Sequence, residues 1–295
     1  MDALRDVLGS PPVPEGSWQR EAVYVSPAAL RRAGGTGRAA VRGPGTAPVR
    51  EAAEDLAARV RAVPGVRTVH VRPNGFLVIE VAEPGEIVRE ILTEPAGPPE
   101  GAVSGSAVSG SAVSPGRMES VWPDAPRTWR NPGFVVRYAY VRAGWVQGWA
   151  RDLGMGAEWG CRTGPPGPPE EGVGVLGEGA GVPGEGVGLP EEGAGVPGED
   201  RGFRPELLGG PYDRAVLRLL AELPSRRAGR DPGWPAYLER LAEAYHDAFE
   251  HAPAIPKGDE PPSAAHAARL RMARAVRKVL AEGLTALGQT PPDKI

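Results

Sequence analysis

The chain has few of the residues on which common active sites depend. It holds one cysteine, Cys161, so an internal disulfide cannot form. Its three lysines all lie at or beyond Lys257, so no earlier segment contains the phosphate-binding lysine of a P-loop. The four histidines lack metal-ligand spacing, and no G-x-S-x-G nucleophile motif occurs. We therefore predict no catalytic residue, no metal and no cofactor.

Long apolar stretches are also missing. No apolar run reaches the length of about 18 residues that a membrane-spanning helix needs. The first ten residues have neither the basic nor the apolar region of a signal peptide. The expectation is a cytoplasmic protein that does not contact membranes.

Glycine and proline are abundant, with 42 and 34 of the 295 residues. They gather in low-complexity segments, for which we predict disordered linkers at 93–121 and 161–200. The second linker holds three G-x-G-x-x-G matches, but no strand or helix pattern flanks them, so coincidence explains them. It also carries eight acidic residues against one basic residue, which leaves the rest of this chain of net charge −3 mildly basic.

Helical and strand patterns divide the remaining sequence. Residues 1–46 are broken by proline and glycine, and we expect them to be poorly structured. Residues 47–92 predict a small α/β unit: a helix, the strands 67–71 and 76–81 joined by an Asn-Gly turn, and a second helix.

Four amphipathic patterns follow in the rest of the chain. Residues 134–153, 213–223 and 235–251 have helical spacing, and a fourth helix is predicted to begin after Ser263 as its N-cap. The predicted fold is mainly α: a helical bundle over 122–160 and 201–295, preceded by the α/β unit.

The last of these helices has an unusual polar side. It carries basic residues and no acid from Ser263 to Ala281, while a separate apolar stripe supplies its core contacts. Its basic residues are His266, Arg269, Arg271, Arg274, Arg277 and Lys278. Such a face is free to meet phosphates, although on composition alone a solvated basic face is the commoner explanation.

Three stretches of the C-terminal part carry a family resemblance. Residues 131–142 read Asn-Pro-Gly-Phe-Val-Val-Arg-Tyr-Ala-Tyr-Val-Arg, residues 237–253 run from Tyr-Leu-Glu-Arg-Leu-Ala to His-Ala-Pro, and residues 268–293 run from Ala-Arg-Leu to Pro-Pro-Asp. In their residues and in their order along the chain, these stretches resemble the anticodon-binding domain of arginyl-tRNA synthetases, often called DALR. The chain departs from that pattern at Arg137 and Tyr140, where the family usually has Gln and His, and in its last three residues. The unit at 47–92 resembles the N-terminal tRNA-contacting domain of the same enzymes.

The resemblance implies tRNA binding, with tRNA-Arg as the first candidate partner. The catalytic domain of such an enzyme belongs between the two units, where Thr93–Val121 leaves no room for it. The ATP-handling His-x-Gly-His and Lys-Met-Ser-Lys motifs are missing too. We therefore expect a stand-alone tRNA-binding protein without aminoacylation activity. The alternatives are arginine-tRNA ligase activity transferred from the family, a module that docks a full-length synthetase or another protein, and a relic without function.

Several side chains are candidates for contacts with the anticodon stem-loop. Aromatic rings stack on splayed bases, and arginines hold phosphates or base edges. The candidates are Tyr138, Arg142, His246, Arg269, Arg271, Arg274 and Arg277. Tyr138 fits a core aromatic equally well, the arginines fit a solubilising face, and His246 is more often a packing histidine.

Overall fold

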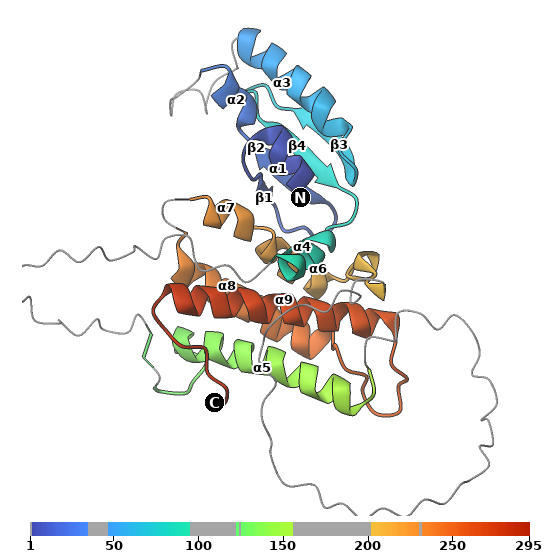
Figure 1. Cartoon of the computed structure of the whole chain (residues 1–295), viewed down its shortest axis with the longest axis vertical. Coiled ribbons are helices and arrows are strands. Elements are labelled where there is room, and N and C mark those ends of the chain that lie inside the picture. The colour runs from blue at the N-terminus through green and yellow to red at the C-terminus, as the bar shows by residue number, and fades with distance from the viewer. Residues whose placement is uncertain (1, 35–46, 95–121, 124, 156–201, 230–231) are drawn as a thin grey trace, which may run out of the picture.

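The computed structural model describes residues 2–34, 47–94, 122–123, 125–155, 202–229 and 232–295 (Figure 1). They form an α/β unit packed on a layer of helices, and the prediction of a mainly α fold is confirmed. The predicted linkers fall almost wholly outside the described residues.

The α/β unit is built on a four-stranded antiparallel sheet with strand order β1-β2-β4-β3. Its elements are α1 (Asp2–Leu8), β1 (Val13–Glu15), β2 (Ala22–Ser26), α2 (Ala28–Arg32), α3 (Ala47–Arg61), β3 (Val66–Val71), β4 (Leu77–Val81) and α4 (Glu86–Thr93). The predicted turn between β3 and β4 is confirmed, with the Gly75 amide bonded to the Arg72 carbonyl. Gly75 has φ +83°, a conformation that glycine adopts without strain.

The expectation that residues 1–46 are poorly structured is wrong for residues 2–34. Strand β2 pairs with β4 along its whole length, and Tyr24 is buried against Trp18 with ring centroids 5.1 Å apart. The Trp18 indole donates to the Val23 carbonyl at 3.1 Å. The pairing joins segments more than fifty residues apart, so the local pattern of prolines and short apolar runs did not reveal it.

The helical layer contains the predicted long helices. Its elements are α5 (Pro132–Asp152), the 3₁₀ turn η3 (Pro205–Leu207), α6 (Pro211–Leu220), α7 (Leu223–Arg227), α8 (Trp234–His251) and α9 (Ala264–Ala286). Ser263 caps α9 as predicted, accepting from the His266 amide. The helix predicted over 213–223 is divided in the structure: α6 ends at Leu220, and Pro224 lies in the first turn of α7, where its missing N–H costs nothing. None of the described helices is long and apolar enough to cross a bilayer.

Helices α9 and α5 differ in position within this layer. Figure 1 shows α9 lying between α5 on one side and α4 and α6 on the other. It packs against α5, α8, α4, η3 and α6. Helix α5 lies at the outer edge and packs against α8 and α9. Among the described residues, α9 therefore has elements on two opposite sides, whereas α5 has them on one side and exposes Trp145 and Trp149.

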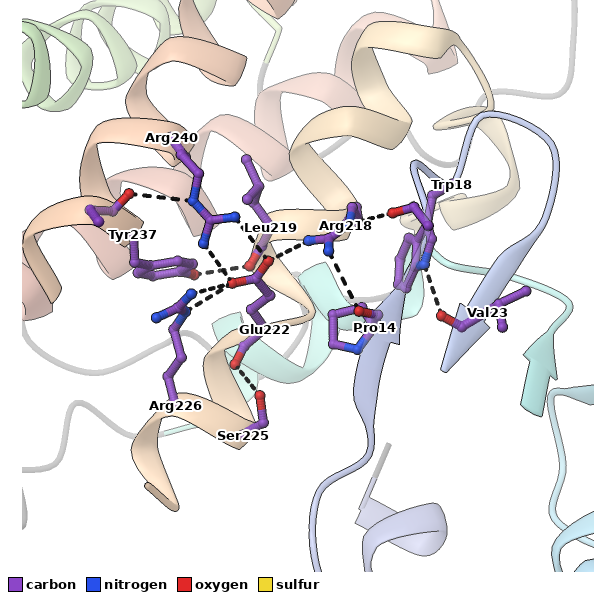
Figure 2. Close-up of polar contacts among 12 residues, drawn as sticks. Pro14, Trp18, Val23, Arg218, Leu219, Glu222, Ser225, Arg226, Tyr237 and Arg240 are labelled. Carbon is purple, nitrogen blue, oxygen red and sulfur yellow. Dashed lines mark hydrogen bonds and ion pairs between the residues drawn. The ribbon is translucent and has the colours of Figure 1, made fainter. Parts of the chain in front are cut away.

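The two units are joined through arginines of α6 (Figure 2). Arg218 donates from Nε to the Gly16 carbonyl at 2.6 Å, and Arg214 donates to the Trp18 and Arg20 carbonyls at 3.2 Å. Behind Arg218 lies a buried carboxylate, Glu222, which also accepts from two further arginines, Arg226 and Arg240. Burial raises the pKa of Glu222, but these hydrogen bonds outweigh burial and the pKa is lowered. Glu222 is therefore held as a carboxylate that orients the arginines at the joint.

Candidate nucleic-acid interface

The loop before α5 is fixed by the N-cap of that helix. The Asn131 side-chain oxygen accepts from the Gly133 amide at 3.0 Å, and its amide nitrogen donates to the Pro123 and Pro126 carbonyls. One buried side chain thus caps the helix and ties down the loop that carries Trp129.

Gly133 and Arg137 hold the same loop from the helix side. A Cβ at Gly133 would lie 2.5 Å from the Cβ of the buried Trp122, so only glycine allows this close approach. Arg137 donates to the Trp122 carbonyl at 3.3 Å and to the Gln289 side chain at 2.8 Å. Arg137, one of the two departures from the family pattern, therefore links the loop to the C-terminal tail.

Five aromatic side chains form a continuous surface array along this loop and α5. The rings meet their neighbours at centroid distances between 5.5 and 6.2 Å. Three of them are indoles with large exposed fractions, 61%, 39% and 45% in chain order, and the other two rings are half-buried. We call this array the aromatic ladder; it consists of Trp129, Phe134, Tyr138, Trp145 and Trp149.

A charged and polar floor supports the middle of the ladder. The Arg142 guanidinium lies 5.0 Å from the Tyr138 ring centroid and 3.9 Å from that of Phe249. It donates to Glu250 at 2.7 Å and contacts His246 Nδ1 at 3.1 Å. These contacts lock Arg142 beneath the rings, with 13% of its side chain exposed.

His246 completes this floor in its neutral form. A guanidinium only donates, so His246 Nδ1 accepts from Arg142, and Nε2 carries the proton donated to the Val135 carbonyl at 3.1 Å. Burial lowers the pKa of His246; the hydrogen bond to the Val135 carbonyl opposes this shift, and the Arg142 charge adds to it. The contacts are those of a packing histidine that orients Arg142.

The basic residues of α9 do not form one free face. Arg269 binds the fully buried carboxylate of Asp213 on α6, from Nε at 3.1 Å and from Nη2 at 3.2 Å. Burial raises the pKa of Asp213, and the hydrogen bonds from Arg269 act against that rise without cancelling it. Arg269 is therefore committed to a partner inside the protein.

Two further basic residues of α9 are committed in the same way. Arg277 donates to the Tyr140 hydroxyl at 3.1 Å and lies over its ring, so Tyr140, the second departure from the family pattern, anchors this arginine. Lys278 donates to the carbonyls of Ile91 and Glu94 at the end of α4. The expectation of a free cationic face is wrong for these residues, because α9 is surrounded by other elements.

The remaining basic residues of α9 have different surroundings. The Arg271 guanidinium lies 5.5 Å from the Phe203 ring centroid, and the Arg274 side chain is exposed. His266 is buried in the cap of α9, where its Nδ1 accepts from the Ser263 amide.

The structure thus brings Tyr138, Arg142 and His246 together and leaves the four candidate arginines of α9 outside that cluster. Sequence reasoning missed the indoles of Trp129, Trp145 and Trp149 as candidate contacts. The available signal was the spacing of aromatic residues at 134, 138, 145 and 149, which follows one face of a helix. An aromatic stripe of this kind is usually core, and only the position of α5 at the edge makes it a surface.

Exposed arginines lie at one end of the ladder. Arg127 and Arg130 are exposed on either side of Trp129 in the loop, whereas Arg151, two residues beyond Trp149, lies on the opposite side of α5 and donates to the Gln147 carbonyl. The ladder therefore combines aromatic rings with positive charge at its Trp129 end, the combination by which proteins bind single-stranded nucleic acid.

Comparison with known proteins points to the same helices. Residues 234–295, which comprise α8, α9 and the C-terminal tail, match the family model of the DALR anticodon binding domain. The C-terminal part of the chain is similar to an arginine–tRNA ligase of Clavibacter sepedonicus, with 39% identity over 98 residues. That match covers 32% of this chain and 18% of the relative. No solved structure matches.

Proposed function

We propose that this protein binds tRNA through the aromatic ladder, which stacks on unpaired bases of the anticodon loop while Arg127 and Arg130 approach the phosphates. The observation that carries the proposal is the exposure of three indoles in one continuous array. Large apolar side chains gathered on a surface mark a binding site, because leaving them in water forgoes the free energy of burial.

The chemistry of the array suits nucleic acid. Base stacking on an aromatic side chain contributes roughly 1–3 kcal/mol per base. The match of α8 and α9 to the DALR anticodon binding domain supports the proposal, because α5 and α8 together build the ladder and its floor. The proposed role agrees with the cytoplasmic location expected from the sequence.

Arginine activation is not part of the proposed function. The relative from Clavibacter is named a ligase, but this chain matches only 18% of it. The segment between α4 and α5 is far shorter than a nucleotide-binding domain of roughly 200 residues. We expect no arginine-dependent exchange between ATP and pyrophosphate, and exchange above a no-protein control would contradict this part of the proposal.

Binding to tRNA-Arg and to an unrelated tRNA, measured across a salt series, tests the proposal. We expect affinity to fall as salt rises, because arginines that neutralise phosphates release counterions. The pair Trp145→Ala and Trp149→Ala should weaken binding, and Tyr212→Ala, which removes an exposed ring from α6, should not. Absence of binding to either tRNA at low salt would refute the proposal.

A docking site for another protein is the second candidate, and the same exposed indoles favour it. Tryptophan and arginine dominate the binding energy of protein interfaces. Salt separates the two functions, since an apolar protein interface depends weakly on ionic strength whereas phosphate contacts depend on it steeply. A full-length synthetase is the first partner to test.

A further inference from the structure

We infer that the aromatic ladder binds unpaired nucleotides with little preference for base identity, so that the protein accepts single-stranded RNA of any sequence and does not itself select tRNA-Arg. This inference rests on the proposed function, because the same surface is used. It adds the kind of recognition that the surface performs.

The polar side chains best suited to read bases are turned inward. Reading a base requires donors and acceptors that meet its edge in a fixed pattern. Arg142 is bound to Glu250 and to His246, whose other nitrogen donates to a backbone carbonyl. Gln147, which lies between the two indoles of α5 in sequence, donates its side-chain amide to the Leu270 carbonyl at 3.0 Å.

The polar atoms of Asn131, the N-cap of α5, are also bonded within the protein. The Asn131 side chain uses its oxygen and its nitrogen within the protein. What the ladder presents to solvent is therefore mainly the surface of Trp129, Trp145 and Trp149, each with a single indole N–H, because Phe134 stacks on the Tyr138 ring and Arg142 lies over it. Every base has a π face, so stacking on such rings tolerates any sequence.

The dimensions of the ladder suit several consecutive bases. From Tyr138 to Trp149 the helix rises roughly 16 Å. Trp129 and Trp145 meet the Tyr138 ring edge-on, with interplanar angles of 65° and 79°. The two indoles keep 61% and 39% of their surface exposed despite these contacts. Bases splayed from a single strand can therefore meet successive rings, whereas bases stacked inside a duplex cannot.

The flanking charges also recognise no sequence. Arg127 and Arg130 are exposed on either side of Trp129, at one end of the ladder. Contacts from arginine to phosphate position a strand without reading its bases. Single strands of A, U and C should therefore gain similar free energy from this surface.

The test is equilibrium binding of the unchanged protein to fluorescein-labelled oligo(A), oligo(U) and oligo(C) RNA of about 12 nucleotides, within the usual range of single-strand sites. A duplex RNA of equal length and tRNA-Arg are measured in the same buffer. We expect the affinities for the three single strands to agree within about tenfold and the duplex to bind more weakly than any of them. Because this comparison needs no variant, it does not depend on any variant folding.

Variants then assign the binding to the ladder. Trp145→Ala with Trp149→Ala should weaken single-strand binding by roughly 5- to 100-fold, the loss of one or more stacking partners. Trp145→Phe with Trp149→Phe should retain most of the affinity, because a π face remains at each position. Tyr212→Ala should leave the affinity unchanged.

The outcomes separate this inference from the proposed function. Binding to tRNA without binding to the oligonucleotides, a spread larger than about tenfold among them, or equal binding to the duplex would overturn the inference and leave tRNA binding intact. Oligonucleotide binding without tRNA binding would support the inference and refute the proposed function. No binding to any of these RNAs would refute both.

Discussion

Helices α5 and α9 use their side chains in opposite ways. Arg269, Arg277 and Lys278 of α9 reach inward to Asp213, Tyr140 and the end of α4, whereas Trp145 and Trp149 of α5 are exposed to solvent. By the usual distribution of residue types, the arginines should be the exposed set and the tryptophans the buried one.

Position within the layer explains the reversal. Helix α9 lies among several elements and has no single solvent face, so its long cationic side chains extend to carboxylates, carbonyls and rings of neighbouring elements. Helix α5 lies at the edge and buries small residues such as Ala139 and Ala143 against its neighbours. A basic stripe is a phosphate-binding surface only where the fold leaves it free, and an aromatic stripe is core only where the fold covers it.

Removing the Arg269 side chain should give the largest loss of stability. In Arg269→Ala the carboxylate of Asp213 stays fully buried without its cation, so we expect the free energy of unfolding to fall by about 3–5 kcal/mol. Urea denaturation measures this fall in the free energy of unfolding. A variant that replaces all the candidate arginines of α9 would therefore report on folding rather than on RNA contact.

Arg274→Ala is the matched control on the same helix. Arg274 is exposed, so its replacement should change stability by no more than about 1 kcal/mol, the upper end for an exposed ionic contact. Equal effects of the two substitutions would show that α9 does not bury its charge in the way described.

Gly283 offers a second measure of how tightly α9 is enclosed. A Cβ there would lie 2.5 Å from the nearest side-chain atom of Leu238, which is fully buried on α8. Gly283→Ala should lower the free energy of unfolding by about 1–3 kcal/mol, because overpacking outweighs the gain in helix propensity. Chemical denaturation measures this change, and a stability equal to or above that of the unchanged protein would contradict it.

The floor beneath the ladder should respond to pH. Burial lowers the pKa of His246 in the folded state, whereas a histidine in the unfolded chain has a pKa of about 6.5. Below about pH 6.5 the unfolded chain binds a proton at this histidine and the folded protein does not. The contribution of His246 to stability is therefore constant above about pH 6.5 and falls as the pH drops toward the folded-state pKa. The slope cannot exceed about 1.4 kcal/mol per pH unit for this one group.

The substitution His246→Gln isolates the contribution of His246 to the pH dependence of stability. The unfolding free energies of both proteins, measured between about pH 7.5 and 5.5, should show a shallower slope for the variant. His266, whose pKa burial also lowers, is present in both proteins, so the difference in slope belongs to His246. Identical slopes would mean that His246 accepts its proton as readily folded as unfolded.

Much of the fold was predictable from the sequence because it depends on local signals. The cap at Ser263, the helix starts at proline and the Asn-Gly turn each act within a few residues. The pairing of β2 with β4 was not predictable, since it joins distant segments. For the candidate site, Tyr138 and Arg142 were identified, but the exposed indoles were not, because their exposure depends on which neighbours α5 lacks.

Gly148→Ala tests the open side of α5 and should give the smallest effect. Gly148 lies in the interior of α5, and a Cβ there would meet no atom of the described residues within 4 Å. Alanine favours the helical conformation more than glycine does, so we expect the free energy of unfolding to rise by about 0.5–1 kcal/mol.

The comparison with Gly283→Ala is direct because the same chemical change is made on two helices. A rise at 148 with a fall at 283, measured by the same denaturation, supports the contrast between an open α5 and an enclosed α9. A loss of stability at both positions would mean that α5 is covered by a part of the chain or by a second copy, and the ladder would then not be available to RNA.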